Sequence, residues 1–228
     1  MKTYDIFLFD ADNTLYDYDK AEAHALKTMF DYCGFNYTEN VRTEYRKINH
    51  PLWERFSKGE ISKEDIQAIR FSRLFERVGV QYDAADFNDK YIYELGKCAF
   101  LIEGAEEVCR AIMSQGKQIF IVTNGVLATQ ESRLKHSSIK GYISGSFVSE
   151  HIGFQKPDRQ YFDYVFANIP QVSKDRIIIV GDSLSADIAG GIAAGIDSCW
   201  FNIDRIENKT DIIPTYEIRT LSELHKFI

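Results

Sequence analysis

Residues 6–14 read IFLFDADNT: four apolar residues followed by a polar segment that contains Asp10 and Asp12. A short run of apolar residues predicts a strand that is buried on both faces, as in parallel sheets covered by helices. In open α/β sheets, ligands bind in the crevice outside the carboxyl ends of the strands. The two aspartates after this strand therefore predict chemistry at that edge of a sheet.

The composition indicates a globular protein with an excess of acidic groups. The chain has 228 residues, of which 45% are hydrophobic and 27% charged, and its formal net charge is −7. This charge argues against non-specific binding to nucleic acid polymers or to an anionic membrane surface, although local cations would still allow a small anionic substrate. No apolar run reaches the length of a secretory signal or a membrane span, so we expect a cytoplasmic protein.

Four helices are expected between residues 17 and 98, where there is little strand signal. Gly34 and Gly79 follow two of the amphipathic segments, in the position where Gly commonly ends a helix. Ser62 is a good N-cap for the third helix, and Pro51 predicts a break or a kink within the second. Four helices with short connections predict a helical bundle.

The remainder of the chain alternates helix and strand, which predicts a parallel sheet with right-handed crossovers. The fold class is therefore α/β: a Rossmann-like parallel-sheet core with helices on both faces, and a helical-bundle cap inserted after the first strand. We expect the core to comprise residues 1–16 and 100–228, and the cap to comprise residues 17–99. Beyond the cap, strands are expected at residues 118–122, 147–148, 176–180 and 199–201, and helices at residues 106–114, 130–136, 159–168, 185–194 and 221–227.

Three of the predicted strands end in a polar residue, namely Asp10, Thr123 or Asp182. A lone Asp-x-Asp is weak evidence, because Asp after a strand is usually a turn former or an N-cap. The ordered set is much stronger evidence, and it predicts one site at one edge of the sheet. Its members are D-x-D-x-T at 10–14, T-N-G at 123–125, K-P at 156–157 and G-D-S-x3-D at 181–187.

This set resembles the haloacid dehalogenase-like phosphohydrolase superfamily, whose four motifs occur in the same order over residues 6–202. More narrowly, D-A-D at 10–12, N-H-P-L-W at 49–53 and the segment 190–202 resemble the house-cleaning pyrimidine 5′-nucleotidases of bacteria. Asn13 stands where the narrower family is expected to have Glu, at a position that is not one of the motif's reacting carboxylates. The resemblance implies a catalytic core covered by a helical cap.

Phosphoryl transfer needs an in-line nucleophile and stabilisation of the charge that spreads over the equatorial oxygens. Asp10, at the tip of its strand, is the candidate nucleophile and would form an aspartyl-phosphate. Asp12 would protonate the leaving oxygen and then activate water, which requires the pKa values of the two carboxyl groups to be pushed apart. The alternative interpretation, two turn-forming aspartates, is disfavoured by the other motifs.

Several carboxylates that face one site are costly without a cation, and oxygen ligands alone suit Mg²⁺. Asp10 and Asp182 are the candidate side-chain ligands, and the resemblance adds the backbone carbonyl of Asp12. Asp187 is assigned either to support of the metal or of Lys156, or to a favourable interaction with a helix dipole.

Phosphate binding is assigned to the segment after the second strand and to one lysine. Thr123 offers a hydroxyl, and Asn124 and Gly125 offer backbone N–H groups near a helix start. Lys156 precedes Pro157, which fits the first position of a helix, and its ammonium is expected to neutralise the phosphate. Thr123 and Lys156 are therefore candidate catalytic residues as well.

Substrate selection is assigned to the cap, where the sequence leaves two interpretations open. Tyr45, Trp53 and Phe56 would stack on a base, an interaction worth about 1–3 kcal/mol. They would equally form the apolar core of a four-helix cap, which is the more common use of such residues.

The leading hypothesis is a Mg²⁺-dependent phosphomonoesterase for nucleoside 5′-monophosphates, pyrimidine ones such as dUMP, dTMP and UMP by resemblance. A phosphatase for phosphoglycolate or a sugar phosphate, or a phosphomutase, would use the same core residues. A binding module that accepts phosphate on Asp10 without turnover is a further alternative, which Asp12 and the large cap disfavour. We expect a small phosphorylated metabolite as the partner, no nucleic acid polymer or membrane, and a monomer or small homo-oligomer.

Overall fold

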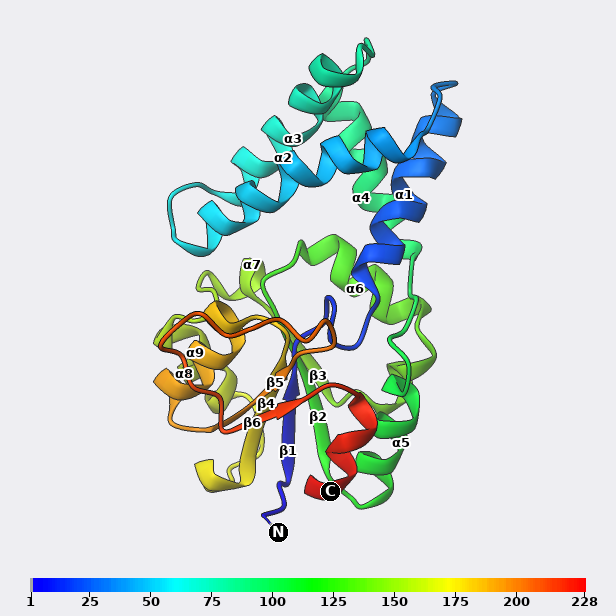
Figure 1. Ribbon diagram of the computed structural model, residues 1–228. Helices are drawn as coiled ribbons and strands as arrows, with labels where there is room; N and C mark the ends of the chain where they lie inside the picture. Colours follow the sequence, from blue (N-terminus) through cyan, green and yellow to red (C-terminus); the bar gives the residue numbers. More distant parts are fainter. Residues whose placement is uncertain (1) are drawn as a thin grey trace.

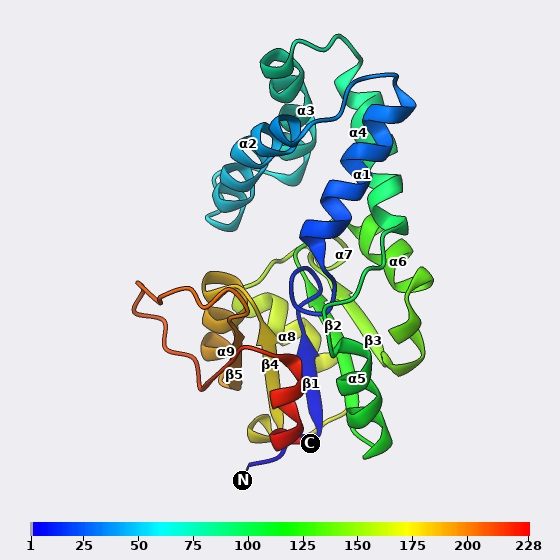
Figure 2. The ribbon, with the colours of Figure 1, turned by 45° about the vertical axis from the view of Figure 1, so that its right-hand side comes forward.

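The structure, a computed structural model, describes residues 2–228. It consists of an α/β core and a helical insertion (residues 18–97) that lies over one edge of the sheet of the core (Figures 1 and 2). The strands are β1 (Ile6–Phe9), β2 (Gln118–Thr123), β3 (Gly145–Val148), β4 (Ile177–Gly181), β5 (Asp197–Phe201) and β6 (Tyr216–Ile218). They form one sheet in the order β3-β2-β1-β4-β5-β6, and each neighbouring pair is parallel. The predicted α/β fold is confirmed.

β1 lies in the middle of the sheet. Its last residue, Phe9, pairs with Ile121 of β2 on one side and with Val180 of β4 on the other. The backbone N–H of Asp10 donates to the carbonyl oxygen of Val180 at 2.9 Å, so the pairing with β4 continues to this residue. The carboxyl ends of these three strands therefore lie side by side.

Both faces of the sheet are buried, as the all-apolar strands predict. Phe9 faces a hydrophobic cluster that includes residues of α5 (Ala105–Ser114), and Leu8 faces a second cluster that includes residues of α8 (Arg159–Ala167). Successive side chains of a strand point to opposite faces, so one run of apolar residues anchors both layers of helices. The core also contains α6 (Leu127–His136), α7 (Ser149–Ile152), α9 (Ala189–Ala194) and a 3-10 helix at Leu221–Phe227.

The helical insertion packs around a hydrophobic cluster of its own. This cluster is rich in aromatic rings, and the centroids of Phe71 and Phe87 lie 4.7 Å apart. The third helix begins with a capping box between Ser62 and Asp65 and ends at Gly79, where φ is 70°, as the sequence signals predict. The four helices are α1 (Tyr18–Tyr32), α2 (Glu39–Ser57), α3 (Lys63–Val78) and α4 (Ala84–Lys97).

The structure differs from the expectations in three places. α2 passes through Pro51 as one helix, so the predicted break is absent; this proline lies on the exposed side while the opposite side packs in the insertion. Pro157 is not the first residue of a helix, since Asp158 takes the N-cap position of α8. The sequence does not predict β6 or α7, because each has only three or four residues and lacks the continuous apolar run that marks β1.

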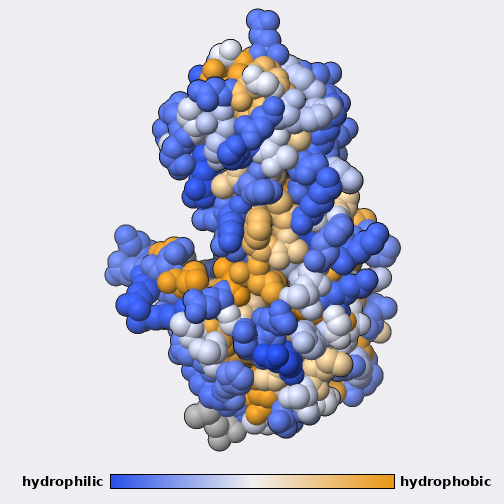
Figure 3. Space-filling model, turned by 90° about the vertical axis from the view of Figure 1, so that its right-hand side faces the viewer, coloured by the Kyte–Doolittle hydropathy of each residue, from blue (hydrophilic) through white to orange (hydrophobic). Residues whose placement is uncertain are grey.

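The surface is hollowed between the two parts of the molecule. Figure 3 shows this hollow between the helical insertion and the α/β core, with hydrophobic residues gathered beside it. Among residues 2–228, no helix combines the length and the apolar character needed to cross a membrane.

Candidate active site

Three carboxylates meet at the carboxyl edge of the sheet. Asp10 follows β1, Asp182 follows β4, and Asp187 lies in a π-helical turn (Leu184–Ile188) that leads into α9. One carboxylate oxygen from each residue lies within 4.8 Å of the other two. The ends of two neighbouring strands thus bring together side chains from distant parts of the chain, as the motif order predicts.

Lys156 joins this carboxylate cluster. Its Nζ donates to Asp10 Oδ1 at 2.6 Å and to Asp187 Oδ1 at 2.7 Å. A third bond reaches the carbonyl oxygen of Val122 at 2.7 Å. The lysine side chain is almost fully buried, so these three acceptors replace its hydration. Loss of either carboxylate would leave part of a buried charge unpaired.

Asn124 holds the loop that carries Lys156. Its side-chain amide donates to the carbonyl oxygen of Lys156 at 2.8 Å and accepts from the N–H of Lys156 at 2.9 Å. Both ends of the amide are therefore engaged by one residue. Asn124 positions Lys156, and only its backbone N–H remains a candidate for phosphate binding.

Thr123 and Gly125 form a tight turn after β2. The N–H of Gly125 donates to Thr123 Oγ1 at 3.0 Å, which leaves the hydroxyl proton of Thr123 for a ligand. A Cβ at position 125 would lie 2.3 Å from Gln130 Nε2. A side chain at this position would therefore displace the amide of Gln130, which donates to Asp12.

Asp12 is turned toward α6. Gln130 Nε2 donates to one of its carboxylate oxygens at 2.6 Å, and Arg133 Nη1 donates to the other. Arg133 is fully buried, and its Nε and Nη2 have no hydrogen-bond partner among residues 2–228. Both oxygens of Asp12 therefore accept from positioned donors, one of them a buried guanidinium.

Sequence reasoning missed Gln130 and Arg133. Their spacing of three positions places them on one face of α6. Polar residues with this spacing are usually on an exposed face, and these two are buried by packing in the folded protein, where α6 lies against α4 and other elements. The pattern alone therefore carries no signal for their role.

The carboxylate cluster shifts the ionisation of its members. Burial raises the pKa of Asp10 to about 7, and Lys156 opposes this rise. Burial likewise raises the pKa of Asp182 well above its usual value, and the charges of Asp10 and Asp187 add to the effect. Burial by itself would lower the pKa of Lys156, but Asp10 and Asp187 raise it above its ordinary value. The cluster therefore contains more negative charge than its lysine balances.

The chemistry of this donor set fits a divalent cation. Three carboxylates face one ammonium, and the available ligand atoms are all oxygens, which Mg²⁺ prefers. Asp10 and Asp182 are the residues that would hold the ion. Asp187 is already engaged, since its Oδ1 accepts from Lys156 and its Oδ2 accepts from the N–H of Ser183 at 3.1 Å. This arrangement favours a role for Asp187 in positioning Lys156.

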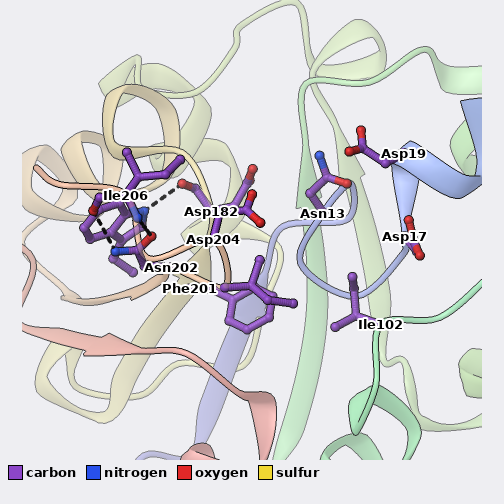
Figure 4. A pocket seen from close by; sticks show the side chains of 11 residues that line it. Asn13, Asp17, Asp19, Ile102, Asp182, Phe201, Asn202, Asp204 and Ile206 are labelled. Carbon is purple, nitrogen blue, oxygen red and sulfur yellow. Dashed lines mark hydrogen bonds between the residues drawn. The ribbon is translucent and has the colours of Figure 1, made fainter. Parts of the chain in front are cut away.

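A smaller cavity of about 230 Å³ adjoins the cluster (Figure 4). Asp182 and Asp204 lie on one side of it, and Asn13 and Asp19 lie on the other. Asn13 has a φ of 58°, a left-handed conformation that Asn adopts more readily than most residues, and its Oδ1 accepts from the N–H of Tyr18 at 3.1 Å. Asn at this position therefore suits the turn that leads into α1.

The main cavity, of about 540 Å³, is lined by both parts of the molecule. The α/β core contributes the carboxylate cluster, Lys156 and the segment 123–125. The helical insertion contributes side chains that include Asn49, Trp53 and Arg70. A ligand in this cavity would contact the candidate catalytic residues and the insertion together.

Of the three aromatic candidates for substrate selection, only one lines the main cavity. Trp53 lines the main cavity. Tyr45 does not, because it is fully buried in the insertion and stacks on Phe71 with a centroid distance of 5.4 Å. Phe56 is also buried, and its ring packs against Trp53. The base-stacking interpretation is therefore corrected for Tyr45 and Phe56, which belong to the core of the insertion.

Comparison with known proteins identifies the family of this chain. Residues 7–201 match the haloacid dehalogenase-like hydrolase family. The Bacillus subtilis protein YfnB, described as a HAD-hydrolase, is 42% identical over 100% of this chain and 97% of its own length. Its crystal structure, bound to magnesium, has a TM-score of 0.92 and covers 99% of this chain and 98% of that one.

Two further relatives are named as pyrimidine 5′-nucleotidases. The pyrimidine 5′-nucleotidase PynA of Streptococcus pneumoniae is 34% identical over 97% of this chain and 93% of its own. The pyrimidine 5′-nucleotidase YjjG of Escherichia coli is 32% identical over 99% of this chain and 98% of its own. The resemblance read from the motifs is confirmed, and the chain belongs to the haloacid dehalogenase-like hydrolase family.

Proposed function

We propose that this hydrolase is a Mg²⁺-dependent phosphomonoesterase that acts on pyrimidine nucleoside 5′-monophosphates through a phosphoryl group carried by Asp10. The observation that carries the proposal is the contact of Lys156 with Asp10, within a carboxylate cluster on the wall of a large cavity. A nucleophilic carboxylate, an ammonium for phosphate oxygens and oxygen ligands for a cation then face one space. The 34% and 32% identity to two pyrimidine 5′-nucleotidases supports the substrate class.

The proposed reaction has two displacements at phosphorus. A carboxylate oxygen of Asp10 attacks the phosphorus, the bond from phosphorus to the 5′-oxygen breaks, and that oxygen takes a proton from Asp12. Water then attacks the phosphorus of the aspartyl-phosphate, its proton passes to Asp12, and the bond from phosphorus to Asp10 breaks. The products are the nucleoside and inorganic phosphate, and both carboxyl groups return to their starting states.

Gln130 and Arg133 fit the second displacement, because they hold Asp12 as an ionised carboxylate that can accept a proton. For the first displacement Asp12 must carry a proton and turn from Arg133 toward the leaving oxygen. The two donors on α6 would therefore bind the base form of Asp12 and release the acid form.

The remaining residues bind and neutralise the phosphate. The Thr123 hydroxyl and the backbone N–H of Asn124 would contact its oxygens beside Lys156, while the N–H of Gly125 must first leave Thr123 Oγ1. Asp10, Asp182 and the backbone carbonyl of Asp12 would hold Mg²⁺. When bound, this ion would supply the positive charge that keeps Asp10 ionised and balances the phosphate oxygens.

The test is phosphate release, with and without Mg²⁺, from dUMP, dTMP, UMP, AMP, phosphoglycolate and several sugar phosphates. Asp10→Asn is the control, and we expect it to abolish turnover while the protein stays folded by circular dichroism. Comparable activity in this variant would refute the nucleophile assignment. Preference for phosphoglycolate or sugar phosphates would refute the substrate class while leaving the mechanism at Asp10 intact.

A phospho-acceptor module is separated from an enzyme by the fate of the phosphoryl group. We expect Asp12→Asn to slow release and to accumulate phosphorylated Asp10, which mass spectrometry of the intact protein detects as an added phosphoryl group. Accumulation in the unmodified protein without release of phosphate would support the module and contradict the enzyme.

A further inference from the structure

We infer that Asn49 reads the hydrogen-bonding edge of the nucleobase, an inference that rests on the proposed nucleotidase function. Asn49 lies in α2, and its side chain lines the same main cavity as Asp10 and Lys156. A substrate whose phosphate is bound at the carboxylate cluster would extend through this cavity toward the insertion. The amide of Asn49 is a buried neutral polar group on that wall, and its hydrogen-bonding capacity is unused among residues 2–228.

The amide of Asn49 is buried and unpaired. The residue is 1% exposed, and neither Oδ1 nor Nδ2 has a hydrogen-bond partner among residues 2–228. An amide offers two donors and an acceptor with two lone pairs, and leaving these unused in a buried place is unfavourable. A ligand that pairs with both groups would remove this cost.

The other buried asparagines show that this chain normally satisfies such amides. Asn88 Oδ1 accepts two bonds from the guanidinium of Arg70, at 2.9 and 2.6 Å. Asn202 donates to the Ile206 carbonyl oxygen and to Glu217, both at 2.9 Å, and it accepts from the Ile206 N–H at 2.8 Å. Among the buried asparagines of the described chain, only Asn49 lacks any such partner.

The surroundings of Asn49 suit a flat ring. Trp53 follows one helical turn later on the same face of α2 and also lines the cavity. Its indole is held by an edge-on contact with Phe56, with centroids 5.5 Å apart and an interplanar angle of 86°. Ile92 and Leu95 of α4 add apolar surface to this wall. An indole, two aliphatic side chains and an unpaired amide on this wall match a planar heterocycle better than a chain of hydroxyl groups.

The edge of a pyrimidine base complements this amide. In uracil and thymine, the N3–H is a donor beside a carbonyl oxygen that accepts, so the Oδ1 and Nδ2 of Asn49 can form two bonds to one edge. In nucleic acid recognition, a bidentate pair between an amide side chain and a base edge discriminates by about 1–3 kcal/mol, which corresponds to about 5- to 150-fold. A sugar phosphate without a base offers no such edge.

The experiment compares two changes: replacement of Asn49 in the protein, and removal of the base from the substrate. The kcat/KM for dUMP and for 2-deoxyribose 5-phosphate, which lacks the base, is measured in the unmodified protein and in Asn49→Leu, which keeps the approximate volume. We expect Asn49→Leu to lower kcat/KM for dUMP by about 10- to 100-fold and to leave 2-deoxyribose 5-phosphate within about twofold. Asn40→Leu, at an exposed position of the same helix, is the matched control and should change neither value.

A second measurement changes the substrate. N3-methyl-dUMP blocks the donor of the base edge, so the unmodified protein should hydrolyse it about 10- to 100-fold less efficiently than dUMP. In Asn49→Leu the two nucleotides should become equivalent. Equal hydrolysis of both by the unmodified protein overturns the inference even if Asn49→Leu does not fold, and so does an equal loss on dUMP and 2-deoxyribose 5-phosphate.

The outcomes also separate this inference from the proposed function. If the unmodified protein hydrolyses dUMP no better than 2-deoxyribose 5-phosphate, the nucleotidase assignment fails and the base-reading role fails with it. If dUMP is preferred but Asn49→Leu preserves that preference, the nucleotidase assignment stands and another residue reads the base.

Discussion

Lys63 of the helical insertion donates from Nζ to the carbonyl oxygen of Gly125 in the α/β core, at a distance of 2.8 Å. The same Nζ donates to Ser149 Oγ at 2.9 Å and lies 3.7 Å from a carboxylate oxygen of Glu150. The lysine is only 7% exposed, so a charged group is buried where the two parts of the molecule meet. Gly125 belongs to the proposed phosphate-binding segment, and the insertion is thereby tied to the geometry of that segment.

Lys63→Met should loosen the insertion. A hydrogen bond from a charged group contributes about 1.5–3 kcal/mol, so its loss should raise KM for the preferred nucleotide by roughly 10-fold or more. Small-angle X-ray scattering should show a larger radius of gyration, because the two parts separate more often. Lys58→Met, at an exposed position just after α2, is the control and should alter neither quantity. An unchanged KM and an unchanged radius of gyration would contradict the role of Lys63.

Gly181→Ala should disable the site through Asp187. A Cβ at position 181 would lie 2.2 Å from the carboxyl group of Asp187, and this carboxylate must then move from Lys156. A displacement of about 1 Å in a catalytic group costs about 100-fold in rate, so we expect a loss of that order in kcat. Gly141→Ala, where the added Cβ meets nothing within 4 Å, should keep full activity. Normal kcat in Gly181→Ala would show that Asp187 is not needed to position Lys156.

Binding of Mg²⁺ should stabilise the folded protein, because the ion offsets repulsion within the carboxylate cluster. We expect the Tm to rise by a few degrees with added Mg²⁺ and to fall again with chelator, at about 2–4 °C per kcal/mol for a chain of this size. Asp182→Asn should abolish this shift. Asp204→Asn, an exposed acidic residue of the adjoining cavity, should retain it. An equal shift in both variants would mean that the ion binds to the acidic surface in general.

Glu22 should make the stability of the helical insertion depend on pH. Burial raises its pKa above 4.5, against the effect of Arg46, whose Nε donates to Oε1 at 3.0 Å; Asp19 adds to the rise and Arg42 opposes it. The folded state therefore binds this proton more tightly than the unfolded chain. The resulting stability is complete below pH 4.5 and is lost as the pH rises through the raised pKa.

The measurement is the difference in Tm between the unmodified protein and Glu22→Gln, followed from pH 4.5 to neutrality. We expect the unmodified protein to lose stability relative to this variant as the pH rises, because only Glu22 acquires a buried charge. Glu76→Gln, at an exposed position of α3, should show a constant difference. A constant difference for Glu22→Gln as well would mean that its carboxyl group titrates normally.

Much of the fold was readable because local patterns and long-range packing agree. The apolar run before Asp10 predicts a doubly buried strand, and Ser62 and Gly79 mark the ends of α3 as the structure has them. The short strand β6 was not predicted, because its three residues at the edge of the sheet are too few to show an alternation of apolar and polar side chains. Tyr45 and Trp53 show what the sequence pattern cannot distinguish within one helix. Both are aromatic, yet only Trp53 lines the main cavity, while Tyr45 is buried in the insertion.

The sequence by itself determined the candidate reacting groups and the edge at which they meet. Asp10, Thr123 and Asp182 lie at the ends of apolar strands, and parallel pairing brings such ends together without further information. Only the tertiary structure decided the partners of these groups. Arg133 and Lys63 carry no local signal, because a charge reveals a specific role only when packing removes its water and leaves it one set of acceptors. The same reason separates Asn49 from the other buried asparagines, since only packing leaves its amide buried without a partner among residues 2–228.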